Sequence, residues 1–341
     1  MTGDRIPVTV LTGFLGAGKT TLLNRLLRHP DMADTAVLIN EFGEIGLDHL
    51  LVGRLDEDTV LLNAGCLCCT VRGDLMRALE DLAARDRPIR RVLVETTGLA
   101  DPAPILQTLL GELPALRRFV LEGVVTVVDA VNGMATLDAQ PEAVKQVAVA
   151  DRLVLAKADL APDHAALLDR LRALNPGAPV LAPGAGPEAL LGAAGDGGYD
   201  PGRRIAEVSA WLAEEARPGD RAGHGHHHHR HDHDRNRHDA RIHAFSVTFD
   251  EPLRWQGIAA FLEMLTATRG DSVLRVKGLL NLADDDRPVA IHGVQHVWHT
   301  PERLPAWPEG DDRRSRLVFI LRDLDRATVE TGLRAFAAAA G

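Results

Sequence analysis

The sequence predicts an α/β fold with a mostly parallel sheet covered by helices, followed by a small C-terminal α+β domain. In residues 1–215, short runs rich in Val, Ile and Leu alternate with segments of helical periodicity. The 341 residues also exceed the usual size of a single core, and a polar tract interrupts the pattern. We therefore expect an N-terminal domain at 1–215, a flexible linker at 216–240 and a C-terminal domain at 241–341.

Seven apolar runs in the N-terminal part predict strands. Their Val, Ile and Leu residues are nearly continuous, which is typical of parallel strands buried on both faces. The predicted strands are Ile6–Thr12, Thr35–Asn40, Thr59–Leu62, Arg91–Glu95, Gly123–Asp129, Arg152–Ala156 and Pro179–Ala182. The predicted helices are Lys19–Arg28, Gly73–Arg85, Ala103–Leu110, Glu142–Val149, Asp163–Leu174 and Arg203–Ala213.

The C-terminal part mixes both kinds of pattern. Strands are predicted at Ile242–Phe249, Ser272–Leu282, Val289–His292 and Leu317–Leu321, and helices at Trp255–Thr268 and Arg326–Ala339. Two helices and several strands in about 100 residues favour a small α+β domain.

The segment Gly13–Thr20 reads GFLGAGKT and matches the pattern G-x-x-x-x-G-K-[ST]. In such a loop the backbone N–H groups converge on phosphate oxygens, and the following helix adds its positive N-terminal end. Lys19 would reach the β- and γ-phosphates, and the Thr20 hydroxyl would bind Mg²⁺. Because a predicted strand precedes the loop and a predicted helix follows it, we expect a P-loop NTPase domain rather than a structural Gly-rich turn. The expected nucleotide-binding residues of this loop are Gly13, Gly16, Ala17, Gly18, Lys19, Thr20 and Thr21.

A second strand, Arg91–Glu95, ends in a carboxylate and continues as Thr-Thr-Gly98. Glu95 stands where a P-loop protein places the carboxylate that supports Mg²⁺, directly or through water. Gly98 could donate its backbone N–H to the γ-phosphate, a contact that hydrolysis breaks. We therefore expect Lys19, Thr20, Glu95 and Gly98 to act in catalysis. The alternative for Glu95, if it stood alone, is an ordinary surface residue at the end of a strand.

The third strand end, Ala156-Lys157-Ala158-Asp159, is similar to the guanine-reading pattern N-K-x-D with its first residue replaced. Asp159 could accept hydrogen bonds from guanine N1–H and the exocyclic amine, which adenine does not offer as a pair. Lys157 would lie along the base. Ala156 cannot supply the polar contact that Asn usually makes, so the strictness of GTP over ATP is open. The alternative is a plain strand-to-helix turn.

All three cysteines of the chain, Cys66, Cys68 and Cys69, lie within four residues. Thiolates are soft ligands that suit Zn²⁺ and related ions, and clustered thiols without a disulfide framework indicate metal or redox chemistry. Glu41 and Glu44 follow the second predicted strand and are candidate further ligands or supporting groups. Two alternatives are buried inert cysteines and a redox relay, although C-x-C-C is not the C-x-x-C pattern of thioredoxins.

Eight histidines lie between His224 and His238, in a tract without apolar periodicity. Imidazole binds Zn²⁺, Co²⁺, Ni²⁺ and Cu²⁺, so the tract is either a metal-collecting arm or a solvated linker with incidental affinity. The net charge of −10 and the dispersed arginines argue against a nucleic-acid partner. No apolar run reaches the roughly 18 residues of a membrane span, and the N-terminus lacks a signal-peptide pattern. We expect a cytoplasmic protein with no membrane partner.

Together these motifs resemble those of the CobW-type GTPases, a family of metal-handling P-loop proteins. The resemblance covers most of the chain, and its most specific element is the triple cysteine motif inside a P-loop domain. The matching pieces are Gly13–Thr20, Asn40–Gly46, Gly65–Cys69, Glu95–Pro102, Val124–Ala130, Ala156–Asp159, Arg275–Gly278 and Arg314–Ile320. The departure is Ala156, where the family usually has a polar residue.

The resemblance implies a GTP-hydrolysing metallochaperone. In that family GTP and Mg²⁺ order the switch segments, the cysteine site binds a transition metal, and hydrolysis relaxes the site for delivery to a client metalloprotein. Zn²⁺ is the first expectation for the cargo and Co²⁺ the second. The family's proposed clients include zinc enzymes, cobalt-inserting machinery and nitrile hydratase, and the sequence does not identify the client or the oligomeric state.

Two other functions fit the same motifs: a metal-responsive sensor, and a metal storage or buffering protein. The residues also indicate slow intrinsic hydrolysis, because no arginine finger or water-orienting Gln is evident in the sequence.

Overall fold

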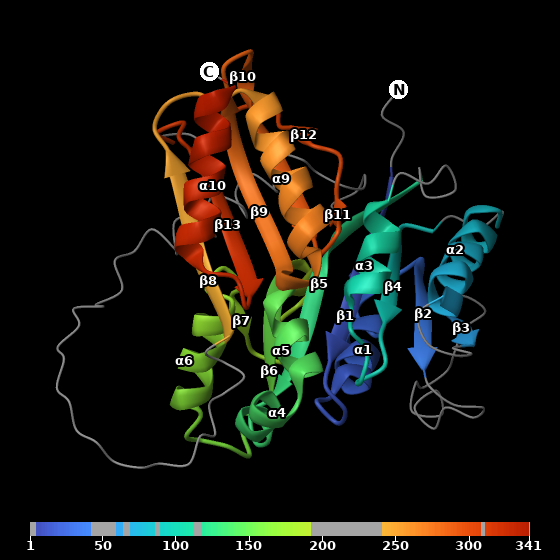
Figure 1. The fold of residues 1–341 in the computed structure, drawn as a ribbon. Coiled ribbons are helices and arrows are strands. Elements are labelled where there is room, and N and C mark those ends of the chain that lie inside the picture. Colours follow the sequence, from blue (N-terminus) through green and yellow to red (C-terminus); the bar gives the residue numbers. More distant parts are fainter. Residues whose placement is uncertain are drawn as a thin grey trace, which may run out of the picture.

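The computed structural model describes residues 5–41, 59–63, 69–85, 89–111, 118–191, 241–307 and 311–340, and these residues form two sheets with their helices (Figure 1). The first sheet has seven strands in the order β3-β2-β4-β1-β5-β6-β7. Its strands are β1 (Ile6–Gly13), β2 (Thr35–Glu41), β3 (Thr59–Asn63), β4 (Arg91–Glu95), β5 (Phe119–Asp129), β6 (Arg152–Ala156) and β7 (Val180–Leu181). Its helices are α1 (Lys19–Leu27), α2 (Cys69–Ala83), α3 (Ala103–Leu110), α4 (Gly133–Ala139), α5 (Pro141–Ala148), α6 (Ala165–Leu174) and α7 (Pro187–Leu191).

All pairings within the first sheet are parallel. β1 lies between β4 and β5 and runs parallel to both. The carboxyl ends of these three strands therefore lie side by side at one edge of the sheet. In a parallel sheet the carboxyl ends of all strands meet at one edge, and ligands bind where the strand order reverses. The segments after β1, β4, β5 and β6 therefore form a single site.

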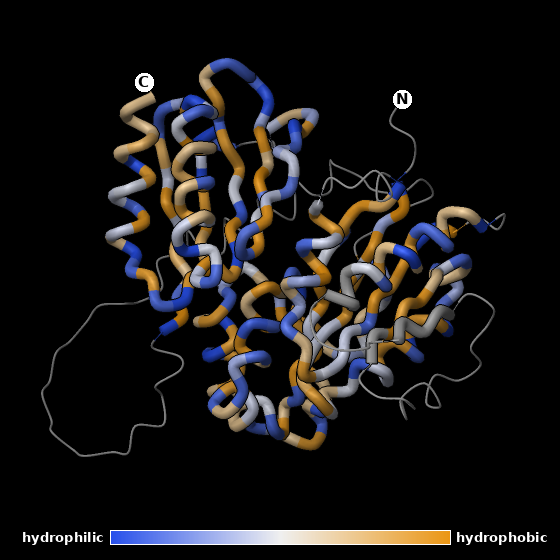
Figure 2. Tube along the Cα trace, turned by 45° about the vertical axis from the view of Figure 1, so that its right-hand side comes forward, coloured by the Kyte–Doolittle hydropathy of each residue, from blue (hydrophilic) through white to orange (hydrophobic). Residues whose placement is uncertain are grey.

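The strands of this sheet are buried on both faces because successive side chains point to opposite sides. In β4, Val92 and Val94 pack into one core with α2 and α3, while Leu93 packs into another core that includes α1. All three side chains are at most 1% exposed. Burying each such side chain stabilises the fold by about 1.5–3 kcal/mol. In Figure 2 the hydrophobic residues accordingly concentrate in the strands.

The second sheet is antiparallel, and two helices cover one of its faces (Figure 1). Its strands are β8 (Ile242–Phe249), β9 (Val273–Leu282), β10 (Asp285–Val294), β11 (Val297–Trp298), β12 (Glu302–Arg303) and β13 (Ser315–Arg322), and its helices are α9 (Trp255–Arg269) and α10 (Arg326–Ala339). Alternate residues of β13, Leu317, Phe319 and Leu321, face the helices in one core. The opposite face packs partly against the first domain, through a cluster of Leu274, Ile320 and Ala148.

A buried ionic cluster joins the two domains. Asp151, the residue before β6, accepts hydrogen bonds from Arg275 and Lys277 of β9, and also from the backbone N–H of Val124. The Asp151 side chain is 14% exposed and that of Arg275 only 3%. Burial alone would raise the pKa of Asp151, but Arg275, Lys277 and His292 outweigh it and hold this pKa well below its usual range.

Four strands and helices have the bounds that the sequence predicts, namely β4, β6, α3 and β8, and so does the terminal helix α10. The structure adds α4 and α7, which sequence periodicity missed, and it begins α2 at Cys69 rather than Gly73. β5 begins at Phe119, four residues before the predicted start. The predicted helix Arg203–Ala213 and the linker at 216–240 lie outside the described residues.

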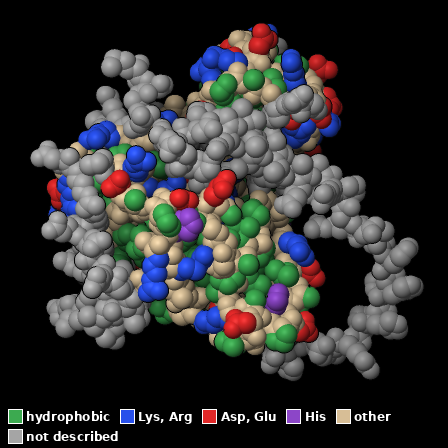
Figure 3. Space-filling view, turned by 180° about the vertical axis from the view of Figure 1, so that it is seen from behind, with side chains coloured by type: hydrophobic (Ala, Val, Ile, Leu, Met, Phe, Trp, Pro, Cys, Tyr) green, Lys and Arg blue, Asp and Glu red, His purple; other side chains and the backbone are tan. Residues whose placement is uncertain are grey.

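The surface mixes charges of both signs. On the face in Figure 3, Lys and Arg side chains lie interspersed with Asp and Glu rather than gathered in one field. Among the described residues, no helix combines the length and the apolar character that crossing a membrane requires.

Replacing Asp151 by Asn should destabilise the chain by roughly 3 kcal/mol at neutral pH, because two cations would lose their buried counter-charge. The pKa of Asp151 is lowered in the folded state, so its contribution is present above about pH 5 and is lost as pH falls toward the folded-state pKa. Urea unfolding of both proteins from pH 7 to pH 3 should therefore show a gap that narrows on acidification. A gap independent of pH would contradict this account.

Candidate functional site

The phosphate loop connects β1 to α1. Gly13 has φ 142°, and a Cβ there would lie 2.3 Å from the carbonyl oxygen of Val127 on β5. No other residue could pass so close to the neighbouring strand. Gly16 and Gly18 also have positive φ, 72° and 103°, so the loop wraps back before α1 begins at Lys19. The loop therefore presents the positive end of α1 at the carboxyl edge of the sheet.

Lys19 lies under the loop rather than in solvent. Its Nζ donates to the carbonyl oxygens of Gly13 at 2.9 Å and Phe14 at 3.3 Å, and the residue is 8% exposed. The ammonium group is therefore held within the turn where it can meet phosphate oxygens.

The neighbouring residue connects the loop to β4. The Thr20 hydroxyl donates to Glu95 Oε1 at 3.0 Å, and Glu95 is 5% exposed. A hydroxyl and a carboxylate held together beside a phosphate loop are the oxygen ligands that Mg²⁺ prefers. The residues present thus fit a Mg²⁺ ion, and Glu95 is a buried partner of Thr20 rather than an ordinary surface glutamate.

The segment after β4 presses against the phosphate loop. Thr96 Oγ1 donates to Thr12 Oγ1 at 2.8 Å, and the Thr96 N–H donates to Leu11 O at 2.9 Å. Two residues later, a Cβ on Gly98 would lie 2.6 Å from the backbone nitrogen of Leu15. Only glycine allows the two segments to approach so closely. A movement of the phosphate loop at Leu15 would therefore also displace Gly98.

The ends of β5 and β6 bind the loop from the other side. Lys157, with φ 58°, donates from Nζ to Gly16 O and to Asp129 Oδ2, both at 2.8 Å. Asp129 also accepts from Asn132 Nδ2 at 3.1 Å and from two backbone N–H groups. Partial burial would raise the pKa of Asp129, but these hydrogen bonds, that of Lys157 first, outweigh it and lower this pKa. Asp129 therefore stays ionised and fixes the Lys157 side chain across the loop.

The two remaining residues of the predicted base-reading motif differ in exposure. Asp159 is exposed, so its carboxylate is accessible to a ligand. Ala156 is 8% exposed and packs in the core beside the phosphate loop. A Cβ added to Gly18 would meet the Ala156 Cβ at 3.8 Å, an ordinary contact. The small side chain at 156 thus lies directly against the loop.

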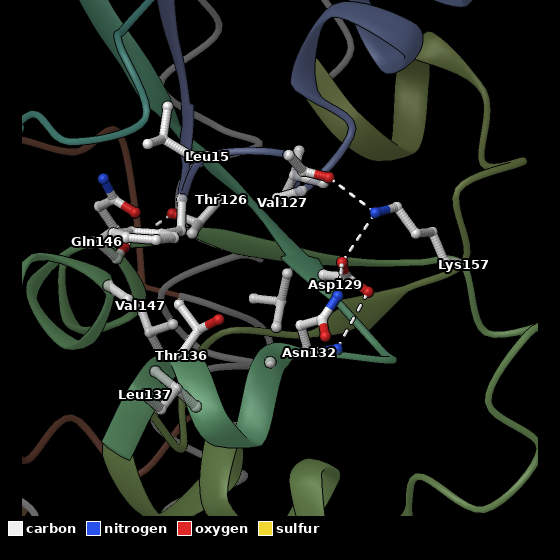
Figure 4. A pocket seen from close by; sticks show the side chains of 16 residues that line it. Leu15, Thr126, Val127, Asp129, Asn132, Thr136, Leu137, Gln146, Val147 and Lys157 are labelled. Atoms are coloured by element: carbon white, nitrogen blue, oxygen red, sulfur yellow. Dashed lines mark hydrogen bonds and ion pairs between the residues drawn. The ribbon is translucent and has the colours of Figure 1, made fainter. Parts of the chain in front are cut away.

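A cavity of about 240 Å³ adjoins the phosphate loop (Figure 4). Its walls come from the loop at Phe14–Ala17, the end of β5, α4 and α5. Lys157 and Asp129 lie on one side of it, and Gln146 of α5 lies on the opposite side, near Leu15.

The predicted transition-metal ligands fall largely outside the described residues. Cys66, Cys68 and Glu44 are not described, and Cys69 and Glu41 are described only as the first residue of α2 and the last of β2. The backbone register is informative nonetheless, because Glu41 pairs with Asn63 at the ends of β2 and β3. β2 and β3 thus end side by side. Ile39 of β2 pairs with Glu95, so both strands end at the same edge of the sheet as β4. Within the described residues no group of three or more metal-binding side chains occurs.

Sequence reasoning missed Asp129 and Gln146 as site residues. Asp129 carried the same signal as Glu95, a carboxylate that ends a buried strand. Gln146 offered no local signal, because it lies inside a helix and its function depends on contacts with residues 48 and 46 positions earlier in the chain.

Family comparisons agree with this architecture. Residues 7–182 match the family described as CobW/HypB/UreG, nucleotide-binding domain, and residues 242–337 match the cobalamin synthesis protein cobW C-terminal domain. The chain belongs to the CobW/HypB/UreG family. It is a P-loop GTPase with a CobW-type C-terminal domain, as the motifs of the sequence indicated.

Curated relatives carry names from metal handling. The chain is 32% identical to the zinc chaperone YjiA of Escherichia coli, over 92% of this chain and 93% of that protein. It is 29% identical to the zinc chaperone CobW of a Sinorhizobium species, over 97% of each chain. It is also 40% identical to the zinc-regulated GTPase metalloprotein activator 1 of Schizosaccharomyces pombe, over 48% of this chain and 41% of that protein.

The fold agrees with a solved structure of this CobW-type group. The Zn(II)-bound YjiA GTPase from E. coli superimposes with a TM-score of 0.63 and 27% identity, over 98% of this chain and 99% of that chain. The CobW-type GTPase described here thus has the same two-domain architecture.

Replacing Gly98 by Ala should lower kcat for GTP hydrolysis at least tenfold, because the added Cβ would collide with the backbone of Leu15. GDP affinity, measured with a fluorescent analogue, should fall by a smaller factor than kcat, since GDP has no γ-phosphate and the clash at Leu15 affects only the loop that binds its β-phosphate. The matched control is Gly184→Ala, where an added Cβ meets nothing within 4 Å. An unchanged kcat in Gly98→Ala would show that this close approach is not needed for turnover.

Proposed function

We propose that this GTPase is a metallochaperone that binds Zn²⁺, or Co²⁺ in its place, at Cys66, Cys68 and Cys69 and delivers it to a client metalloprotein. The observation that carries the proposal is the register of Glu41 with Asn63, next to β4. This register supports the proposal, because β2 and β3, which lead into the glutamate and cysteine segments, end at the same edge of the sheet as β4. The names of the relatives support zinc as the cargo.

The phosphate loop and its partners would hold GTP with Mg²⁺. Gly13, Gly16, Ala17, Gly18 and Thr21 contribute backbone groups to the cradle, and Lys19 neutralises the β- and γ-phosphates. Thr20 and Glu95 hold Mg²⁺, which when bound neutralises the charge that develops on the phosphates. Among the described residues these groups fit the ion, because Thr20 and Glu95 are already 3.0 Å apart.

Gly98 would report the presence of the γ-phosphate. Its N–H contacts that group in the GTP state, and hydrolysis removes the contact. Because Gly98 follows β4 and Glu41 ends the neighbouring β2, a shift at Gly98 moves the edge from which the metal segments start. Metal and nucleotide affinities are then coupled, and the coupling must be reciprocal.

Lys157 and Asp159 would select guanine. Replacing Asp159 by Asn should weaken GTP binding at least tenfold, because the amide cannot accept from both N1–H and the exocyclic amine. Xanthosine triphosphate carries a carbonyl in place of that amine, so the Asp159→Asn variant should bind it better than wild type does. Competition of GTP, ATP and XTP against a fluorescent GTP analogue measures both effects. Equal GTP affinity in the two proteins would remove Asp159 from base recognition.

Nucleotide control of the metal site is tested by titrating Zn²⁺ and Co²⁺ against a chromophoric chelator. The chain with residues 216–240 deleted is compared in Mg²⁺ with a non-hydrolysable GTP analogue and in Mg²⁺ with GDP. We expect metal affinity at least tenfold higher in the GTP-analogue state. Co²⁺–thiolate absorption should disappear in Cys66→Ala and in Cys68→Ala. Equal affinity in both nucleotide states would favour metal storage.

The second candidate function, metal sensing or storage, rests on the His-rich tract between His224 and His238. Deletion of 216–240 should collapse the capacity of a storage protein, whereas a chaperone keeps its cysteine site. Transfer of metal from the GTPase to candidate apo-enzymes separates a chaperone from a sensor.

A further inference from the structure

Helix α5 holds the segment that follows β4. Gln146 donates from Nε2 to Gly98 O at 3.2 Å and to Ala100 O at 3.0 Å. One residue earlier, Lys145 Nζ forms an ion pair with Asp101 Oδ2 at 2.7 Å. Three contacts from two adjacent helical residues thus reach a four-residue stretch that contains Gly98. This stretch, residues 98–101, is called the switch segment below.

Gln146 is buried behind the switch segment rather than in solvent. It is 1% exposed, and it lines the cavity beside the phosphate loop (Figure 4). Both hydrogens of its amide nitrogen have a carbonyl to meet, so the side chain is committed to the switch segment. A buried amide in this arrangement fixes a backbone conformation, because losing the donor would leave two carbonyls unsatisfied.

The helix that carries Gln146 is itself fixed at its C-terminal end. Five consecutive backbone carbonyls, those of residues 146 to 150, each lie within hydrogen-bond distance of a side-chain donor. Thr126 of β5 donates to Gln146 O, and the amide of Asn175 reaches the carbonyls of Val147, Ala148 and Ala150. The last four carbonyls of a helix have no partner within the helix, and here side chains of other elements supply one.

The remaining carbonyl, that of Val149, is bound by a residue of the C-terminal domain. Arg275 of β9 donates to Val149 O, and the same guanidinium pairs with Asp151. A continuous set of contacts therefore runs from the C-terminal sheet, through the C-terminal half of α5, to the switch segment.

We propose that Gln146 is a positioning residue for GTP hydrolysis, which sets the switch segment so that the Gly98 N–H meets the γ-phosphate. This rests on the role proposed above for Gly98. Gln146 does not touch the reacting atoms; it acts by fixing the carbonyls of Gly98 and Ala100. A displacement of reacting groups by about 1 Å can lower the rate about a hundredfold. Loss of the Gln146 hydrogen bonds should therefore lower kcat. Ground-state nucleotide binding depends on the phosphate loop and on Lys157, whereas the side-chain hydrogen bonds of Gln146 go to Gly98 and Ala100.

The test uses steady-state GTP hydrolysis by the full chain with Mg²⁺. Gln146→Met keeps the length of the side chain and removes both donors. We expect kcat to fall about tenfold to a hundredfold, while KM for GTP and the Kd of fluorescent GDP change less than about threefold. Lys145→Met removes the more exposed tether and should lower kcat in the same direction by about threefold. It also keeps the proposal testable if Gln146→Met does not fold.

The matched control is Thr266→Val, which removes a buried helical hydrogen bond to Leu262 O in the C-terminal domain. This variant should lower thermal stability but should not lower kcat selectively while leaving KM unchanged. If Gln146→Met and Lys145→Met retain kcat within twofold of wild type while Gly98→Ala abolishes turnover, the positioning role is wrong and the Gly98 role survives. If Gly98→Ala also turns over normally, the close approach of Gly98 to Leu15 is not needed for turnover, and the proposed coupling of Gly98 to the phosphate loop fails as well. Parallel losses in kcat and GDP affinity would reduce Gln146 to a structural residue.

Discussion

Parallel pairing of β1 with both β4 and β5 is the constraint on which the site depends. It sends three strand ends to one edge, so that the phosphate loop after β1 has a carboxylate on each side: Glu95 at the end of β4 and Asp129 at the end of β5. The two carboxylates have different partners. Glu95 accepts a hydrogen bond from the hydroxyl of Thr20, and Asp129 accepts one from the ammonium group of Lys157. One strand end thus offers oxygen ligands that suit a metal ion, and the other holds the Lys157 side chain across the phosphate loop.

The close approaches around the loop explain which side chains the site tolerates. Gly13 touches the backbone of β5, Gly98 touches the backbone at Leu15, and Ala156 packs beside Gly18. Dense packing of this kind does not deform gradually; segments in contact shift together or not at all. A phosphate group that moves the loop by a fraction of an ångström would therefore displace the segment after β4 as a unit. That property is what a nucleotide-dependent switch requires.

Much of this could be read from the sequence, because the local signals were strong. β4 and β6 are short apolar runs that end in turns, and α3 and α10 are uninterrupted helical patterns, so their bounds follow from local chemistry. The early part of β5 was missed because Glu122 interrupts the apolar run. The structure accommodates that charge between strands, where Thr9 donates to it at 2.8 Å and Arg91 pairs with it at 3.7 Å. Lys19, Thr20 and Glu95 followed from motif and strand context, and Asp129 offered the same signal as Glu95, whereas the side-chain hydrogen bonds of Gln146 are all with residues distant in sequence.

The C-terminal domain contacts both helices that adjoin the switch segment. It contacts α5 through Arg275 and α3 through the hydrogen bond from Gln107 to Gln295, 3.1 Å long. α3 begins directly after the switch segment, and α5 holds that segment from behind. If the switch segment moves between nucleotide states, either the contacts of both helices transmit that movement to the C-terminal domain or the buried Asp151 cluster absorbs it. Breaking buried ion pairs costs several kcal/mol, so the easier response is for the second sheet to follow the helices. By linkage, a ligand that binds the C-terminal domain with different affinity in the two nucleotide states would then bias the nucleotide site toward the state that it prefers.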